Sequence, residues 1–273
     1  MTVFGRPRNF LIAYRRLLIA GVVGLMCLEP QAVPQPKNKI VHVFVALADN
    51  AHQGIVPVPA ELGDGDDADR NLYWGAAFGV RTFFTKSKDW IRLGQPYAVD
   101  HHVLQRVAFR HSSSGTYLVA DAYRGGEIKQ AVEDFLAAAA GLQPAIEFDG
   151  TAGGKPVHIE AKADLVVYVG HDGLMDFSLQ HSFQGGKEGG RQAIILACAS
   201  KAYFADELRR AGAEPLLWTT GLMAPEAYTL KAALDGWIAG ESKEQIRRRA
   251  AAAYAQYQKT SQKAVLRLFA SDW

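Results

Sequence analysis

The sequence predicts a three-layer α/β protein, in which a mostly parallel central sheet lies between two layers of helices. The first observation is a series of continuous apolar runs of strand length, which is typical of strands buried on both faces. The second is that stretches with helical spacing of apolar residues alternate with these runs, an order typical of parallel sheets. The expected strands are residues 39–49, 103–111, 116–125, 163–173, 191–200 and 213–221.

The domain begins with a buried strand and a long loop. The β-branched, apolar run KIVHVFVALAD (39–49) is followed by polar Asn50. Residues 50–72 lack periodicity and are rich in Gly, Pro and Asp, which predicts a surface loop, and loops of this length are usually functional or mobile. Residues 71–86 have roughly helical spacing of apolar residues and are expected to form a short helix.

A hairpin and an amphipathic helix follow. The strands 103–111 and 116–125 are joined by Ser-Ser-Ser-Gly at 112–115, a sequence typical of a tight turn. Residues 127–141 have the apolar spacing of an amphipathic helix, which ends at Gly141.

The second half of the chain alternates strands with helices. The runs 163–173 and 191–200 are apolar throughout their centres, so they are expected in the middle of the sheet. A last helix is expected to start at Ser242, with Glu244 close behind as a capping residue. The helices expected here are residues 204–212, 225–240 and 242–270, with the strand 213–221 after the first of them.

Composition excludes two broad classes of protein. Hydrophobic residues make up 49% and charged residues 21% of the 273 residues, which is the balance of a folded protein and not of a disordered one. The net charge of +2 comes without a concentrated basic face, so nucleic acid is not an expected partner.

The N-terminus has the layout of an export signal. Residues 1–16 contain four Arg and no acid, and residues 17–28 are uncharged and apolar. A basic segment before an apolar stretch of this length is typical of a secretory signal, with an uncleaved membrane anchor as the alternative. We therefore expect a periplasmic or secreted protein, or one anchored to the membrane. The expected organisation is a signal or anchor (1–32), a linker (33–38), an α/β domain (39–240) and a C-terminal helix packed on it (241–273).

Cysteine usage singles out one side chain. The sequence has two Cys, and Cys27 lies within or beside the signal, so Cys198 is the sole thiol of a processed chain. A single Cys in an exported protein is expected to be a reactive group or to form an intermolecular disulfide. The alternative is a small apolar residue that fills a gap in the core.

Two polar residues at strand ends are the candidate catalytic pair. His171 comes after the run LVVYV, in a Gly-flanked turn. Cys198 comes after the run AIIL, and it lies 27 residues after His171 in the chain. Neighbouring parallel strands lie about 4.8 Å apart. An imidazole and a thiol at the same ends of two such strands therefore lie close enough to cooperate.

This layout resembles the caspase-like superfamily of cysteine peptidases, which includes caspases, legumains, gingipain-type enzymes and CHAT domains. Their motif is an apolar block with His-Gly, followed by a second apolar block that ends in Ala-Cys or Ser-Cys; Ala197-Cys198-Ala199-Ser200 is similar to the legumain branch. The segment FADELRRAGAEPLLWTTG is similar to the one after the nucleophile in CHAT domains. The resemblance, over roughly residues 39–240, implies a caspase-like fold.

The resemblance also implies roles for individual residues. Cys198 would be the nucleophile, and His171 the general acid–base that protonates the leaving amine. The N–H groups of Gly173 and Cys198 would form the oxyanion hole. The sequence differs from the motif in having Asp172 between the His and the Gly.

Substrate contacts are assigned to polar residues near these turns. Asp49 and Asn50 follow the first strand and are expected to line a pocket, together with Asp172. The acidic loop 61–69 is expected to be solvated; attraction of a basic peptide or of calcium is the alternative, although the spacing does not match an EF-hand. The histidines lack a ligand spacing such as His-x-x-x-His, so neither a metal nor another cofactor is expected.

Three functions are compatible with these observations. The first is an exported, caspase-like cysteine hydrolase that cleaves peptide bonds in a peptide or protein substrate. The second is a non-catalytic caspase-like module that binds a peptide or protein partner on the cell envelope. The third is an α/β hydrolase of another type in which Cys198 has no role.

Overall fold

The computed structural model describes residues 38–185 and 191–273, together with Met1, Thr2 and Gly5. Nearly all of the expected signal or anchor (1–32) and of the linker (33–38) therefore lies outside the described residues. The described residues from Asn38 to Trp273 belong to one compact unit. In the described part of the chain, no helix has the length and apolar character needed to cross a membrane.

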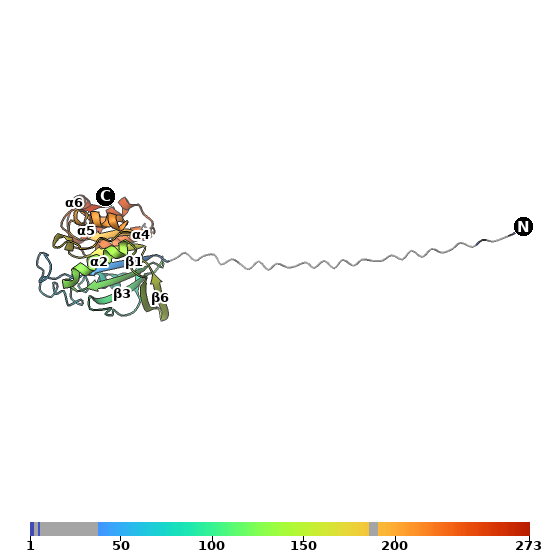
Figure 1. Cartoon of the computed structure of the whole chain (residues 1–273), viewed down its shortest axis with the longest axis horizontal. Helices are drawn as coiled ribbons and strands as arrows, with labels where there is room; N and C mark the ends of the chain where they lie inside the picture. Colours follow the sequence, from blue (N-terminus) through green and yellow to red (C-terminus); the bar gives the residue numbers. More distant parts are fainter. Residues whose placement is uncertain (3–4, 6–37, 186–190) are drawn as a thin grey trace. The chain divides into compact units, whose positions relative to one another are not determined.

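The centre of this unit is an eight-stranded mixed sheet with the order β10-β9-β8-β7-β1-β4-β3-β2. Figure 1 labels β1 and β3 in this sheet. The five strands from β9 to β4 are parallel to their neighbours, whereas β10, β3 and β2 pair antiparallel at the two ends. The expectation of a mostly parallel sheet is therefore confirmed. The strands are β1 (Ile40–Ala46), β2 (Trp90–Arg92), β3 (Val103–His111), β4 (Tyr117–Tyr123), β7 (Leu165–Val169), β8 (Gln192–Leu196), β9 (Glu214–Thr219) and β10 (Phe269–Ala270).

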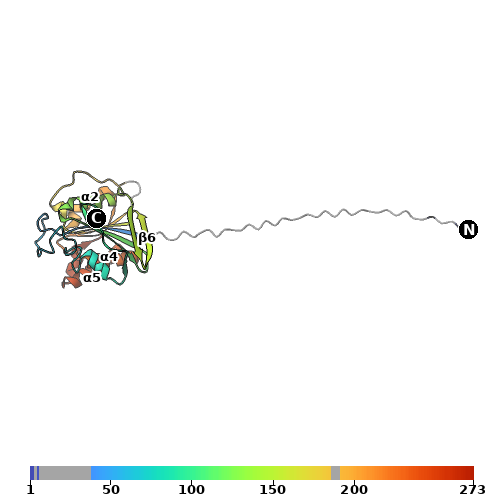
Figure 2. The same ribbon diagram turned by 90° about the horizontal axis from the view of Figure 1, so that it is seen from below.

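Helices cover both faces of this sheet. Figure 2 shows α2 on one side of the sheet and α4 and α5 on the other. The buried side chains divide in the same way, because those of α2 and α3 pack on one face and those of α1, α4 and α5 on the opposite one. The helices are α1 (Val80–Lys86), α2 (Ile128–Ala139), α3 (Ser200–Ala211), α4 (Ala227–Ile238), α5 (Lys243–Tyr257) and α6 (Gln262–Leu268).

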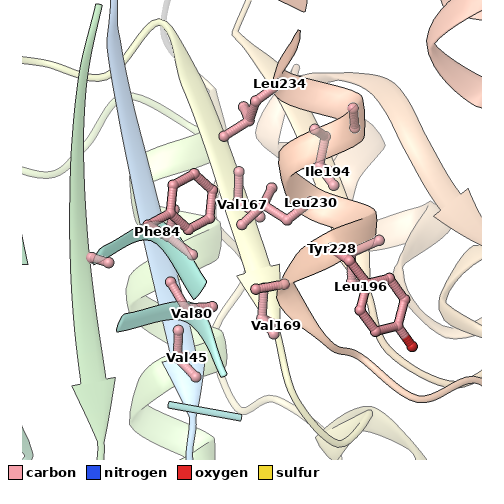
Figure 3. Packing of buried hydrophobic residues seen from close by; sticks show 14 of the residues in the cluster. Val45, Val80, Phe84, Val167, Val169, Ile194, Leu196, Tyr228, Leu230 and Leu234 are labelled. Carbon is pink, nitrogen blue, oxygen red and sulfur yellow. The ribbon is translucent and has the colours of Figure 1, made fainter. Parts of the chain in front are cut away.

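Successive side chains of a strand point to opposite faces of the sheet, so each strand contributes to the hydrophobic core on both faces. In β1, Val43 and Val45 point to the α4 side, whereas Phe44 and Ala46 point to the α2 side. Figure 3 shows the first layer, in which strand residues such as Val169 pack against α1 and α4. Every residue of β1 is buried, which explains why its sequence reads as a continuous apolar run.

A hairpin that the sequence analysis did not predict packs beside the sheet. Strands β5 (Ile146–Ala152) and β6 (Lys155–Ala161) pair antiparallel, and Gly153 and Gly154 both have positive φ in the turn. Phe148 and Ile159 of the hairpin are buried against the sheet. The neighbouring positions of both strands are exposed, so their composition resembles that of a loop.

Two expected helices are shorter in the structure. The helix expected over 71–86 is wrong for its first half, because the backbone before α1 forms turns in which Gly75 lies against the Asp69 carbonyl, too close for any Cβ. The expectation of one helix over 242–270 is also wrong. Lys259 has a φ of 51°, and the Ser261 hydroxyl then caps a separate helix, α6, which is followed by β10.

A buried ion network ties β1, β3 and β4 together. The Asp121 carboxylate accepts hydrogen bonds from the Arg106 guanidinium at 2.6 and 2.7 Å and lies 2.8 Å from His42 Nε2. Burial by itself would raise the pKa of Asp121, but the bonds from Arg106 and His42 outweigh it and lower this pKa to about 2. Asp121 is therefore a buried anion, and its negative charge is stabilised by Arg106 and His42.

Candidate active site

A pocket of about 320 Å³ opens at the edge of the sheet where the parallel strands end. His171, which follows β7, and Cys198, which follows β8, both line it. Such edges are the usual location of sites in open α/β sheets. The structure thus brings together the two residues that the sequence analysis singled out.

The pairing register explains why these two side chains line the same pocket. Val169 of β7 is the parallel partner of Leu196 of β8, and the Gly170 amide donates to the Leu196 carbonyl at 3.2 Å. His171 and Cys198 each come two residues after this pair, so they occupy equivalent positions on neighbouring strands. Gly170 has a φ of 149° and lies against the Ala46 backbone, a conformation and a closeness that exclude larger residues.

A strained turn presents Cys198 at the end of β8. The next residue, Ala199, has a left-handed φ of 48°, and α3 begins immediately afterwards at Ser200. Left-handed backbone is uncommon for a residue with a side chain and is concentrated at functional sites. A sharp turn between a strand and a helix is also how other hydrolases expose a nucleophile.

Buried hydroxyl groups hold this turn in place. The Ser200 hydroxyl donates to the Ile195 carbonyl at 3.0 Å and accepts from the Thr219 amide at 3.0 Å. Thr219 in turn donates its hydroxyl to the Ala197 carbonyl. Both side chains are fully buried, so they fix the backbone on each side of Cys198.

The Cys198 side chain is partly accessible. Its sulfur lies 3.5 Å from the Met223 amide nitrogen and 3.6 Å from the Met223 carbonyl oxygen. It also lies at the N-terminus of the twelve-residue helix α3, where the helix dipole favours negative charge. This location differs from that of a thiol that only fills a gap in the core.

A carboxylate orients the imidazole of His171. His171 Nε2 lies 2.7 Å from Asp176 Oδ2, which also accepts a hydrogen bond from the Gly54 amide at 3.1 Å. The Tyr168 hydroxyl donates to the His171 carbonyl at 2.8 Å and fixes the backbone there. If Nε2–H donates to Asp176, the lone pair of the ring is on Nδ1, and this nitrogen is the one that can take a proton from a thiol.

Asp176 is not among the site residues that the sequence predicts. This residue follows the short 3-10 helix η2 (Gly173–Met175), which places its carboxylate next to the imidazole five residues earlier. Nothing in the spacing of an isolated acid predicts such a contact. A thiol, an imidazole and a carboxylate are nevertheless the groups that many hydrolases combine to activate a nucleophile.

Gly173 begins η2 and is buried. The first N–H of a helix has no acceptor within the helix, but neither Gly173 nor Asp172 is among the described residues that line the pocket. Asp172 precedes it, and its Oδ1 accepts the Leu174 amide at 3.1 Å. Asp172 therefore shapes the turn that carries Gly173.

Asp172 is fully buried, and its Oδ2 has no hydrogen-bond partner among the described residues. Burial, followed by the negative charge of Asp176, raises the pKa of Asp172 to about 7. The folded protein therefore holds this proton more tightly than the unfolded chain does. Between about pH 4 and 7, this group lowers the stability of the fold as the pH rises.

Replacing Asp172 by Asn is expected to remove this loss of stability at higher pH. At pH 8 the free energy of unfolding should rise by on the order of 2 kcal/mol, because Asn keeps the Oδ acceptor and carries no buried charge. At pH 4, where the folded wild-type protein holds the proton, the two proteins should differ little. Urea unfolding at both pH values measures this, and an equal effect at the two pH values would contradict it.

The other expected substrate residues have local bonding roles. Asp49 is buried; its Oδ1 accepts the amides of Ala51 and His52, and its Oδ2 lies 2.8 Å from His52 Nδ1. The Asn50 side chain bonds the amide and the carbonyl of Val58. Both residues thus organise the loop after β1, whose residues 54–56 and 58 contribute to the pocket.

The acidic loop is tied to arginines. Asp66 pairs with Arg124, Asp69 with Arg81, and Asp67 Oδ2 lies 2.5 Å from Arg70 Nε. Within residues 38–185 and 191–273, no group of three or more His, Cys, Asp or Glu side chains could hold a metal ion.

The fold and this site together define an α/β protein with an eight-stranded, mostly parallel sheet flanked by helices, with a thiol and an imidazole in one pocket at its edge. Comparison with protein-family models, curated proteins and solved structures finds no match to the chain.

Proposed function

We propose that the chain is an exported, caspase-like cysteine hydrolase that cleaves peptide bonds through Cys198 and His171. The observation that carries this proposal is that the two side chains line one pocket from equivalent positions on neighbouring parallel strands. The strand order, the strained turn after the nucleophile and the resemblance of the two apolar blocks support it. The proposal that the protein is exported rests on the composition of residues 1–32.

The proposed reaction proceeds through an acyl-enzyme. The Cys198 thiolate attacks the carbonyl carbon of the peptide bond, and the N–H groups of Gly173 and Cys198 donate to the developing oxyanion. His171 gives a proton to the nitrogen, the C–N bond breaks, and the amine leaves behind a thioester. Water then adds to the thioester while His171 takes its proton, and breakage of the C–S bond releases the carboxylic acid.

Asp176 has a positioning role in this reaction. Its bond to Nε2 holds the ring so that Nδ1 can exchange a proton with the thiol and with the leaving group. Met175, next to it in the chain, lines the same pocket, so the turn that orients the imidazole also contributes to the site.

Chemical inactivation tests the proposal. The purified protein is incubated with an unfolded protein substrate, and new peptide ends are identified by mass spectrometry. We expect cleavage, and we expect it to stop once iodoacetamide has alkylated Cys198, with the adduct located by peptide mapping. Cleavage that continues after complete alkylation would contradict the proposal. A folded protein with an inert Cys198 and no cleavage would instead favour a non-catalytic binding module.

A further inference from the structure

We propose that the pocket beside Cys198 recognises an apolar, uncharged side chain, so that the residue before the cleaved bond is aliphatic. This inference rests on the proposed function of the same site and names its class of substrate. It follows from the composition of the pocket, from its exposed apolar rim and from the pairing of the nearby charges.

Four separate segments supply an apolar lining. One is the loop after β1, the second precedes α1, the third is η2, and the fourth follows β9. Aliphatic side chains and one buried tyrosine account for most of the wall. The residues are Ile55, Val56, Val58, Leu72, Tyr73, Met175, Leu222, Met223 and Pro225. Burial, and secondly the nearby Cys198, raise the pKa of Tyr73, so its ring adds an uncharged surface.

The rim of the pocket is apolar and exposed. Val56 is 81% exposed, Leu222 74% and Met175 42%, and all three line the pocket. Single exposed apolar residues are common on proteins. Three of them around one opening, next to a thiol and an imidazole, form a surface suited to an apolar ligand.

Apart from the proposed catalytic residues His171 and Cys198, the lining offers no partner for a charged substrate side chain. Among the described residues that form the pocket there is no Asp, Glu, Lys or Arg. Asp176, which is adjacent in the chain to Met175, is engaged by His171 and Gly54. Four of the five acids in the loop 61–69 pair with arginines, namely Glu61, Asp66, Asp67 and Asp69. A charged side chain would lose its water without gaining an opposite charge, which is strongly unfavourable.

The size of the pocket fits one side chain and its flanking backbone. A volume of about 320 Å³ is at the lower end of ligand sites. Full burial of a leucine-sized side chain is expected to improve reactivity by roughly 10- to 100-fold over a side chain that stays outside. This sets the scale of the expected selectivity.

Peptidyl acyloxymethyl ketones test the inference on the full folded protein. The Cys198 thiolate displaces the carboxylate of the probe, and a thioether to the methylene carbon forms. Probes that differ in the residue before the ketone, with Leu, Ala, Arg or Asp, are compared by their rates of labelling at Cys198. We expect the Leu probe to react at least about 10-fold faster than the Arg and Asp probes, with Ala in between.

A pair of variants localises the selectivity. Leu222→Asp adds a charge at the rim and should reduce the advantage of Leu over Arg at least about 10-fold. Leu142→Asp is the matched control, because Leu142 is 58% exposed and follows Gly141, which lies against Arg191 at the start of β8 and so at the opposite edge of the sheet. Val56→Asp serves in place of Leu222→Asp if that variant does not fold.

Results that differ from these expectations would contradict either the apolar selectivity or the proposed function. A faster Arg or Asp probe, or equal rates for all four probes, would overturn the apolar selectivity while leaving Cys198 a reactive nucleophile. A change in selectivity that is equal in Leu142→Asp would also contradict it. Failure of every probe and of iodoacetamide at Cys198 would overturn the proposed function itself.

Discussion

Replacing Cys198 by Ala is expected to lower the rate of peptide hydrolysis by about 10³-fold or more, and His171→Ala should have an effect of similar size. The two groups act in the same steps, because the imidazole manages the proton of the thiol that attacks. Their effects should therefore not add, and the double variant should be about as slow as either single variant. Initial rates of cleavage of a peptide or unfolded protein substrate measure this.

Two controls separate catalysis from folding. His181→Ala changes an exposed histidine ten residues after His171 and should leave the rate unchanged. Urea unfolding of Cys198→Ala should show a loss of only about 1 kcal/mol, since a partly accessible thiol is exchanged for a methyl group. A large loss of stability together with undiminished hydrolysis would show that Cys198 has a structural role only.

The second large effect is expected from Asp121→Asn. This change keeps the shape of the buried Asp121 side chain but leaves the partly buried Arg106 guanidinium without its counter-charge. Breaking a buried ion pair on one side costs about 3–5 kcal/mol. Asp149→Asn is the matched control, because Asp149 pairs with His158 on the surface and its loss should cost about 0.5 kcal/mol or less. A cost of less than about 1 kcal/mol for Asp121→Asn would contradict this account of the network.

The same network predicts part of the pH dependence of stability. Because the pKa of Asp121 is lowered to about 2 in the folded protein, the unfolded chain takes up this proton first as the pH falls. The contribution of Asp121 is therefore fully present above about pH 4 and is lost progressively towards pH 2. Asp121→Asn should flatten this acid arm of the stability profile, whereas Asp149→Asn should preserve it.

The sheet could be predicted from the sequence because its central strands are buried on both faces. The runs that became β1, β7 and β8 contain apolar residues at nearly every central position, and short runs of this kind are typical of buried parallel strands. The hairpin of β5 and β6 was missed because only Ile146 and Phe148 of β5 and Ile159 of β6 are buried, which is too few apolar positions to give a clear strand pattern. The division between α5 and α6 was missed because no Gly or Pro marks it.

The residues of the candidate site also fall into a group that the sequence predicts and a group that it does not. His171 and Cys198 could be predicted because each closely follows an apolar strand, and the ends of parallel strands meet at one edge of the sheet. Asp176 and the apolar wall could not, because they come from turns and loops without periodicity. Their contacts depend on how segments far apart in the chain pack together, which local patterns do not encode.

The rate of Cys198 alkylation tests most directly whether the thiol and the imidazole act together. The rate of reaction with iodoacetamide is measured near neutral pH in the folded wild-type protein, in His171→Ala and in the control His181→Ala. An imidazole beside the thiol can take its proton, and only the thiolate reacts, so we expect the wild-type protein and the control to react at least about 10-fold faster than His171→Ala. Equal rates in the folded wild-type protein and in His171→Ala would mean that the imidazole does not influence the sulfur, and the catalytic pair would have to be abandoned.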